Sequence, residues 1–300
     1  MHPSLLVVRG ASRLGHLGKM SKICSVSKLP IQISLIFPGG GYSWLSERES
    51  HPVERTLHEA GFRAAVLYYD TDTKVLGLTP LKQAAWGLAK VRELYPGDPV
   101  YVLGFSAGSH CAGSLAVHWN HRDWEGKELF SEVKAFLGDP EMPLERFRPD
   151  RAALSYPVVT SGPFAHFGSF TRLTGIPEEE IRRIAELEEK RTSELTPEAD
   201  GPKARELRWF SLEKQADGSM PPAFLWHTAE DESVPVQNSL LLSDALVKAK
   251  VPVEMHIYPH GVHGLSLATE EVAEPEKNRF ADPHVAGWFD AMIRWMKEEI

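Results

Sequence analysis

The sequence predicts an α/β protein with a doubly wound, mostly parallel sheet that has helices on both faces. Apolar runs of strand character alternate with amphipathic helical segments along most of the 300-residue chain, which is typical of a parallel sheet. A G-x-S-x-G motif at residues 104–108 also marks a sharp turn from a strand into a helix. A chain of this length can bury one large core, so we expect one main domain.

The first half of the chain predicts three strand–helix pairs. Each strand is a short apolar run, and each helix repeats apolar residues every three to four positions. Gly61 suits the end of the first helix, and Pro80 suits the first turn of the second. In chain order the pairs are strand 31–37 with helix 53–60, strand 63–67 with helix 79–94, and strand 99–103 with the helix after Ser106.

The second half continues the alternation by the same criteria. The last helix has an apolar face that includes Trp288, Met292 and Met296, as expected for a helix packed on the sheet. In chain order the elements are strand 152–159, strand 223–228 with helix 237–249, and strand 253–257 with helix 284–300.

Two regions interrupt this alternation. Residues 141–151 form a proline- and charge-rich connection, and residues 161–219 form a long insertion between two strands. Within the insertion, residues 177–191 are highly charged and contain i,i+4 pairs such as Glu178–Arg182. Two interpretations stay open: a solvated helix face, or a small cap over a functional site, because long insertions in compact domains are often functional.

The N-terminal segment has an unusual charge pattern. Residues 1–46 include five Lys or Arg side chains but no Asp or Glu. We expect residues 1–29 to be a basic extension without regular structure, ahead of a domain at residues 30–300. A transit peptide and a natural start at Met20 are the alternatives.

Charge and composition disfavour several classes of partner. The formal net charge of −8 at pH 7 disfavours nucleic acid and anionic membranes. No apolar run approaches the ~20 residues that a membrane-spanning helix needs. Cys24 and Cys111 are too few for a disulfide framework and suit a reducing compartment. We therefore expect a cytoplasmic protein that acts on a small molecule.

Ser106, at the centre of the G-x-S-x-G motif, is the candidate nucleophile. The apolar run at residues 100–103 precedes the motif, and the small residues Ala107, Gly108 and Ser109 follow the serine. This is the context of a nucleophile elbow, which presents a serine hydroxyl at the carboxyl edge of a sheet. A plain strand-to-helix turn is the structural alternative.

A serine nucleophile needs a base to accept its proton and an acid to orient that base. Asp231 follows strand 223–228 and is the candidate acid, with Glu230 as the alternative. His263, followed by a glycine in the loop after strand 253–257, is the candidate base, and His260 is its competitor. The order serine, acid, histidine is the one that this architecture uses. His227 lies within a strand and is expected to pack behind the site.

The third requirement is an oxyanion hole made of backbone N–H groups. The glycine run at residues 39–41 follows the first clear strand and lets bare backbone approach a substrate. We expect Gly40, Gly41 and Ala107 to donate these hydrogen bonds. A phosphate-binding loop is disfavoured because no lysine follows the glycines with P-loop spacing.

Five segments together resemble one protein family, the bacterial acetyl esterase/lipase-like α/β-hydrolases, near the feruloyl esterase and acetylxylan esterase branch related to dienelactone hydrolases. The segments are residues 37–42, 104–110, 155–158, 226–236 and 256–265. The resemblance covers about residues 29–268. It implies an α/β-hydrolase fold, Ser106 as nucleophile, Asp231 as acid and His263 as base.

Three features depart from the family pattern. Pro38 stands where hormone-sensitive-lipase-like relatives have a histidine, as in the acetyl esterase branch. Little sequence precedes the first clear strand, so the usual opening antiparallel strands are missing or atypical. The insertion at residues 161–219 is longer than the family pattern, which implies a remodelled pocket.

The leading interpretation is a serine carboxylesterase of short acyl esters, which needs no metal or organic cofactor. The resemblance implies acetyl groups on xylan-derived oligosaccharides as substrates. Tyr42, Trp44 and His166 are candidate substrate-binding residues near the mouth of the site, although aromatic residues there also suit ordinary packing. An amidase or peptidase on the same scaffold, and a catalytically silent binding protein, are the alternative functions.

Overall fold

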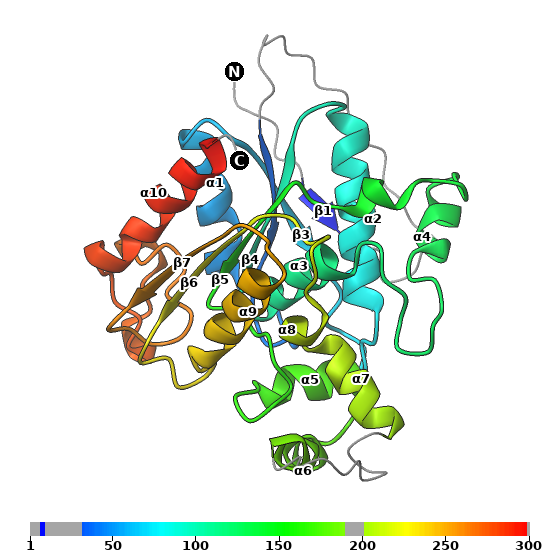
Figure 1. The fold of residues 1–300 in the computed structure, drawn as a ribbon. Coiled ribbons are helices and arrows are strands. Elements are labelled where there is room, and N and C mark those ends of the chain that lie inside the picture. Colours follow the sequence, from blue (N-terminus) through cyan, green and yellow to red (C-terminus); the bar gives the residue numbers. More distant parts are fainter. Residues whose placement is uncertain (1–6, 10–31, 190–200, 299–300) are drawn as a thin grey trace.

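The structure is a computed structural model that describes residues 7–9, 32–189 and 201–298. Within these residues, seven strands form one sheet in the order β1-β3-β2-β4-β5-β6-β7, and every neighbouring pair is parallel (Figure 1). The strands are β1 (Val7–Arg9), β2 (Ile33–Phe37), β3 (Arg63–Tyr68), β4 (Val100–Phe105), β5 (Arg151–Ser155), β6 (Ala223–Thr228) and β7 (Val253–Tyr258). The parallel, doubly wound sheet is confirmed.

Ten α-helices occur in the described part of the chain. They are α1 (His51–Glu59), α2 (Thr79–Leu94), α3 (Ala107–His118), α4 (Ser131–Phe136), α5 (Phe167–Thr174), α6 (Glu178–Glu189), α7 (Pro202–Phe210), α8 (Leu212–Gln215), α9 (Gln237–Lys248) and α10 (Pro283–Lys297). Short 3₁₀ turns add η1 (Glu47–Glu49), η2 (Leu144–Phe147), η3 (Glu270–Val272) and η4 (Pro275–Lys277).

Helices cover both faces of the sheet, each over its own apolar core (Figure 1). In β2, Leu35 and Phe37 face the core under α2, α3 and α9, whereas Ile36 faces the core under α1 and α10. This is the two-residue alternation of a strand that is buried on both faces. The six strands and five helices predicted outside the insertion all form, within a few residues of the expected ends.

Strand order reverses between β2 and β4, which are neighbours in the sheet although β3 separates them in the chain. From β2 the chain moves outward to β3, returns past β2 to β4 and then continues through β5, β6 and β7. In open parallel sheets, ligands bind beyond the carboxyl ends of the strands at such a reversal. The loops after β2 and β4 carry the glycine run and Ser106.

The predicted strand 152–159 ends early, at Ser155. Tyr156 adopts a positive φ of 35°, and its backbone N–H donates to the Trp226 carbonyl at 2.8 Å. The N–H of Val158 then donates to the Ser106 carbonyl at 3.3 Å. The chain therefore leaves the sheet here to contact the nucleophile turn, which an apolar sequence pattern does not reveal.

Part of the predicted N-terminal extension differs from expectation. Val7–Arg9 forms β1, a parallel edge strand paired with β3, because edge strand β3 offers unpaired backbone groups to a short extended segment. The rest of residues 1–29 lies outside the described residues. The described edge strand is parallel to its neighbour.

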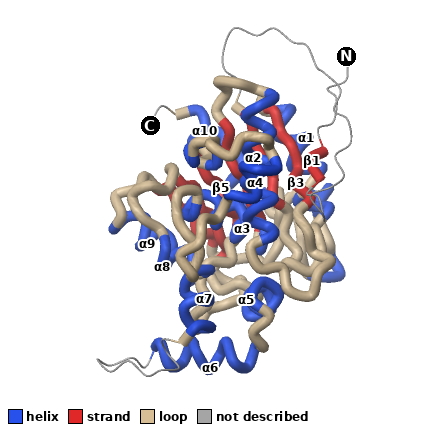
Figure 2. The backbone as a smooth tube through the Cα atoms, turned by 90° about the vertical axis from the view of Figure 1, so that its right-hand side faces the viewer, coloured by secondary structure: helices blue, strands red, loops and turns tan. Residues whose placement is uncertain are grey.

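The insertion at residues 161–219 contains α5, α6, α7 and α8. Figures 1 and 2 show α5, α6 and α7 gathered at one end of the molecule, with α6 at the outside. Helix α6 buries Ile181, Ile184 and Ala185 and exposes the predicted Glu178–Arg182 ion pair, 2.6 Å long. This helix therefore has a solvated face and a packed face.

Candidate active site

The chain turns sharply from β4 into α3 at Ser106, which has φ 54° and ψ −120°. Both motif glycines are required at this turn. A Cβ on Gly104 would lie 2.4 Å from the Ser109 Cα, and one on Gly108 would lie 2.1 Å from the Phe37 carbonyl oxygen. Such distances are far below van der Waals contact, so only glycine fits either position.

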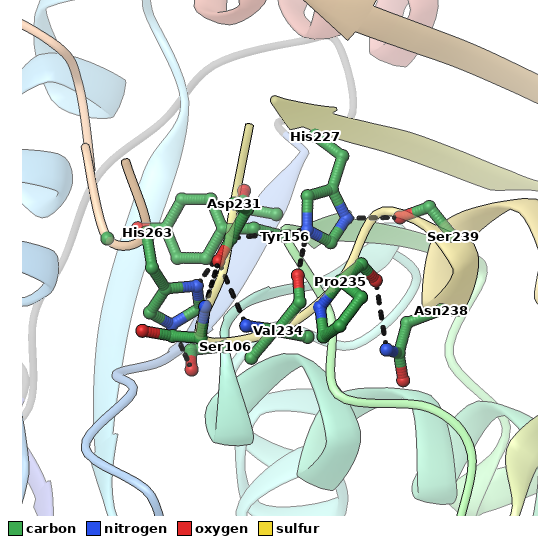
Figure 3. A network of polar contacts seen from close by, with 12 residues as sticks. Ser106, Tyr156, His227, Asp231, Val234, Pro235, Asn238, Ser239 and His263 are labelled. Atoms are coloured by element: carbon green, nitrogen blue, oxygen red, sulfur yellow. Dashed lines mark hydrogen bonds and ion pairs between the residues drawn. The ribbon is translucent and has the colours of Figure 1, made fainter. Parts of the chain in front are cut away.

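Ser106, His263 and Asp231 form one hydrogen-bonded chain across three loops (Figure 3). The Ser106 Oγ lies 2.8 Å from the His263 Nε2, and the His263 Nδ1 lies 2.6 Å from the Asp231 Oδ2. The structure thus brings together the three residues expected from the sequence, at separations suited to proton transfer.

Asp231 is buried but well satisfied by hydrogen bonds. Its Oδ1 accepts from the backbone N–H groups of Ser233 and Val234 at 3.0 and 2.9 Å. Burial raises the pKa of Asp231, but the contacts with His227 and His263 outweigh this effect and hold the pKa below its ordinary value. An ionised Asp231 fixes the orientation of His263 and stabilises its protonated form.

His227 lies behind the site, as expected from the sequence. It is fully buried, with its Nε2 3.3 Å from the Asp231 Oδ2 and 2.8 Å from the Val234 carbonyl oxygen. Its Nδ1 lies 2.8 Å from the Ser239 Oγ, which joins α9 to this network (Figure 3). His227 therefore supports the loop that carries Asp231 and does not reach Ser106.

The two alternative residues pair with each other on the surface. The His260 Nδ1 lies 2.8 Å from the Glu230 Oε1, and both side chains are more than half exposed. The geometry therefore favours His263 and Asp231 over His260 and Glu230.

The oxyanion loop, residues 38–42, follows β2 beside Ser106. Gly40 has φ 129° and Gly41 has φ 62°, and a Cβ on Gly40 would lie 2.0 Å from the Trp44 carbonyl oxygen. Within the described residues, the backbone N–H groups of Gly40, Gly41 and Ala107 donate no hydrogen bond. They remain available to a substrate oxygen.

A cavity of about 540 Å³ opens next to Ser106. Its wall combines the oxyanion loop, η1, the start of the insertion and the loop that carries His263. The lining residues are Gly40, Gly41, Ser43, Trp44, Ser46, Arg48, Glu49, Ser106, His166, Gly168, Thr171, Arg172, Glu178, Ser233, His263, Gly264 and Arg279. Helix α5 and the first residue of α6 therefore border the site directly.

Tyr42 was a candidate substrate contact by its position, and that expectation is wrong. The side chain is 1% exposed and does not line the cavity. Its hydroxyl donates to the Nδ1 of His110 at 2.8 Å, and the Nε2 of His110 lies 2.8 Å from the Phe210 carbonyl oxygen. Burial lowers the pKa of His110 to about 4, so this histidine is neutral and accepts the bond. Through this hydrogen bond, Tyr42 anchors the oxyanion loop to α3.

Trp44 and His166 do line the cavity. The Trp44 side chain is 53% exposed and offers a flat apolar surface at the mouth. The His166 Nδ1 accepts from the backbone N–H of Ser169 at 3.3 Å at the start of α5, so in the neutral ring the proton is on Nε2. Burial lowers the pKa of His166, which favours this neutral form.

Sequence reasoning missed Glu49, Tyr156 and Arg172. Arg172 lines the cavity and donates to the backbone carbonyls of Tyr42, Thr71 and Lys74, which fastens α5 to the oxyanion loop. The sequence offers no signal for it, because one arginine in a charged insertion resembles its neighbours.

Two further arginines on the cavity wall, Arg48 and Arg279, pair with Glu274 at 3.2 and 2.5 Å. Burial raises the pKa of Glu274, but hydrogen bonds from Lys277 and Arg279 together with the charge of Arg48 lower it to about 2. The Nε of Arg279 also donates to the His263 carbonyl at 2.9 Å. This ion-pair group therefore supports the loop that carries the histidine.

Across residues 7–9, 32–189 and 201–298, no group of three or more His, Cys, Asp or Glu side chains is arranged to hold a metal ion. No helix in that part of the chain combines the length and apolar character needed to cross a membrane.

Comparison with known proteins identifies several relatives. The model of the prolyl oligopeptidase family, Peptidase_S9, matches residues 183–291. Endo-1,4-beta-xylanase B of Butyrivibrio fibrisolvens is 34% identical over 245 residues, or 79% of this chain. The chain spans 33% of the length of that curated relative, so the activity of the whole relative does not carry over.

Solved structures match over most of the chain. An acetyl ester-xyloside bifunctional hydrolase from Caldicellulosiruptor lactoaceticus is 31% identical with a TM-score of 0.68, over 91% of this chain and 85% of that one. A carboxylesterase from Lactobacillus plantarum is 22% identical with a TM-score of 0.67, over 93% and 90% of the two chains. At that identity the second match supports the fold alone.

Proposed function

Because this chain belongs to the α/β-hydrolase family and is a serine hydrolase, we propose that it is a carboxylesterase that removes short acyl groups, above all acetyl, from xylan-derived oligosaccharides. The observation that carries the proposal is the Ser106–His263–Asp231 hydrogen-bond chain at the wall of an open cavity.

In the proposed acylation step, the Ser106 hydroxyl attacks the ester carbonyl carbon while His263 takes its proton. Negative charge develops on the carbonyl oxygen and is stabilised by the N–H groups of Gly40, Gly41 and Ala107. Asp231 stabilises the imidazolium ion that forms. The C–O bond to the alcohol then breaks, and His263 gives its proton to the leaving oxygen.

Deacylation repeats these steps with water as the nucleophile. The water oxygen attacks the carbonyl carbon of the acyl-enzyme while His263 takes a proton from the water. The same three N–H groups stabilise the second tetrahedral intermediate. The bond between the acyl carbon and the Ser106 Oγ then breaks, His263 returns its proton to the Oγ, and free carboxylic acid leaves. The protein's own groups suffice for both steps.

Two observations support a sugar as the alcohol. A cavity of about 540 Å³ exceeds the needs of an acetyl group, and the exposed ring of Trp44 at its mouth offers a stacking surface. The relative from Caldicellulosiruptor lactoaceticus bears the name of an acetyl ester-xyloside hydrolase. We therefore assign the acyl group to the side of the oxyanion loop and the sugar to the mouth.

Acetate release from acetylated xylo-oligosaccharides, measured beside p-nitrophenyl acetate and butyrate, tests the proposal. Wild type should release acetate from the sugar and prefer the acetyl ester to the butyryl ester. Ser106→Ala should reduce kcat by several orders of magnitude. Near wild-type activity of Ser106→Ala would reject the mechanism, and activity on nitrophenyl esters alone would reject the sugar substrate.

The match to the prolyl oligopeptidase family model favours one second candidate, an amidase or peptidase. The same serine, histidine and oxyanion loop would act on an amide carbonyl. Hydrolysis of peptide p-nitroanilides at rates above those of the acetyl esters would favour this candidate.

A further inference from the structure

We propose that Glu49 is a positioning residue that ties the oxyanion loop to the histidine loop, residues 259–268, and so keeps the oxyanion N–H groups aligned with the Ser106–His263 pair. Glu49 ends η1 and is 3% exposed. This inference rests on the proposed esterase function, because it assigns a role within the same site.

On one side, Glu49 fixes the oxyanion loop. Its Oε2 accepts from the backbone N–H of Gly39 at 2.8 Å, and the Gly39 carbonyl accepts from the Ser46 N–H at 3.0 Å. Glu49 therefore holds the peptide plane between Pro38 and Gly39, and the Ser46 N–H holds the next plane, between Gly39 and Gly40, by its carbonyl. Because a trans peptide directs its N–H opposite to its carbonyl, the orientation of the Gly40 N–H is set as well.

On the other side, Glu49 reaches the histidine loop through Tyr156. The Tyr156 hydroxyl donates to the Glu49 Oε1 at 2.6 Å and accepts from the backbone N–H of Ser266 at 3.0 Å. The Tyr156 ring packs edge-on against the His263 ring, with centroids 5.1 Å apart. One buried carboxylate thus joins both loops through groups that have no other role in the proposed chemistry.

Glu49, Gly39 and Ser106 pack closely against one another. A Cβ on Gly39 would lie 2.8 Å from the Glu49 Oε2 and 2.9 Å from the Ser106 Cβ, so the carboxylate and the serine pack on the same glycine. A small shift of Glu49 therefore moves the oxyanion loop relative to Ser106. Misalignment would weaken binding of the transition state more than binding of the ester, which lowers kcat with little change in KM.

Glu49→Gln is the sharpest variant because it keeps the shape of the side chain. Its amide oxygen can accept from Gly39, but its NH₂ group then faces the Tyr156 oxygen, and the phenol proton loses its acceptor. Tyr156→Phe keeps the ring beside His263 and removes only the bridging hydroxyl. Glu47→Gln is the matched control, because Glu47 begins the same turn but is exposed and does not line the cavity.

The experiment measures p-nitrophenyl acetate kinetics, inhibition by phenylboronic acid and thermal unfolding for all four proteins. Boronic acids report on the oxyanion hole, because Ser106 Oγ adds to boron, His263 takes the proton, and the tetrahedral boronate carries the negative charge. Glu49→Gln should lower kcat about 10- to 100-fold with KM within about twofold, and weaken boronate binding in parallel. Tyr156→Phe should lie between it and the control, and the melting temperatures should agree within a few degrees.

Wild-type kcat in folded Glu49→Gln would overturn the inference. A lower labelled fraction with a fluorophosphonate probe, together with wild-type turnover per labelled site, would also overturn the inference. In that case the substitution reduces only the amount of correctly folded enzyme, which indicates a structural role alone. If wild type itself neither hydrolyses the ester nor reacts with the probe, the proposed function fails first and the inference fails with it.

Discussion

At the scale of single residues, the environment and not the residue type separates the candidate catalytic groups from their neighbours. Glu230 and Asp231 are adjacent, yet Glu230 pairs with His260 at the surface whereas Asp231 is buried against His263 and His227. Only the buried pair reaches Ser106. A difference of one position in the chain therefore decides which carboxylate can orient the base.

The two histidines of the same loop give a direct comparison. His263→Ala should lower kcat/KM for p-nitrophenyl acetate by about 10³-fold or more, because in the described part of the chain His263 is the side chain that hydrogen-bonds to the Ser106 Oγ. His260→Ala should stay within about twofold, since its contact with Glu230 is exposed at the surface and contributes little energy. Equal losses in the two variants would contradict the assignment of the base.

His166 offers a prediction about the substrate. Asparagine at this position can keep the hydrogen bond from the Ser169 N–H that begins α5, but it has no counterpart of the Nε2–H. Glutamine can present a donor near the Nε2 position instead. His166→Asn should raise KM for acetylated xylo-oligosaccharides by about 3- to 10-fold, the value of one hydrogen bond, and His166→Gln should raise it less. KM for p-nitrophenyl acetate is the control and should change little in both.

At the scale of elements, the turn from β4 to α3 fixes the position of the nucleophile through close backbone contacts. Ser106 sits where β4 stops and α3 starts, and its N–H donates to the Ser155 carbonyl of the neighbouring strand at 3.0 Å. The motif glycines let α3 approach β2 and β4 without side chains between them. The sequence predicts this turn well because its steric demands leave no alternative to glycine.

Gly104→Ala and Gly287→Ala test this packing. The Cβ on Gly104 would meet backbone at 2.4 Å, whereas one on Gly287, in the exposed face of α10, would meet nothing within 4 Å. Gly104→Ala should therefore destabilise the protein by about 3 kcal/mol or prevent folding. Gly287→Ala should stabilise it by about 0.5–1 kcal/mol through helix propensity. Urea unfolding of both variants measures the difference, and a stable, fully active Gly104→Ala would contradict the turn geometry.

At the scale of the whole molecule, the sequence predicts the features that local chemistry controls. The alternation of strands and helices, the elbow glycines and the order serine, acid, histidine each depend on short segments. Tyr42 and Glu49 could not be assigned in this way, because their roles depend on long-range contacts. Tyr42 bonds to His110, 68 residues away, and Glu49 bonds to Tyr156, 107 residues away. No local pattern distinguishes buried Glu49 from exposed Glu47 in the same turn.

The candidate site also couples to the stability of the whole molecule through Asp231. Its pKa in the folded state lies below the ordinary value of 3.8, because hydrogen bonds from His227 and His263 outweigh the effect of burial. A carboxyl group with a depressed pKa stabilises the folded state above the pKa of the unfolded chain. That stability is lost as the pH falls toward the folded-state pKa, because the unfolded chain then binds more protons.

Thermal unfolding from pH 6 to pH 3 should therefore show a steeper fall in melting temperature for wild type than for Asp231→Asn, which has no proton to bind at this position. The unfolding enthalpy at each melting temperature converts the slope into protons taken up on unfolding, so the comparison does not depend on the absolute stability of the variant. Glu230→Gln is the matched control for the neighbouring exposed carboxylate and should leave the slope closer to that of wild type. Parallel curves for wild type and Asp231→Asn would show that Asp231 titrates alike in the folded and unfolded chains, and that its hydrogen bonds to His263 and His227 only compensate for its burial.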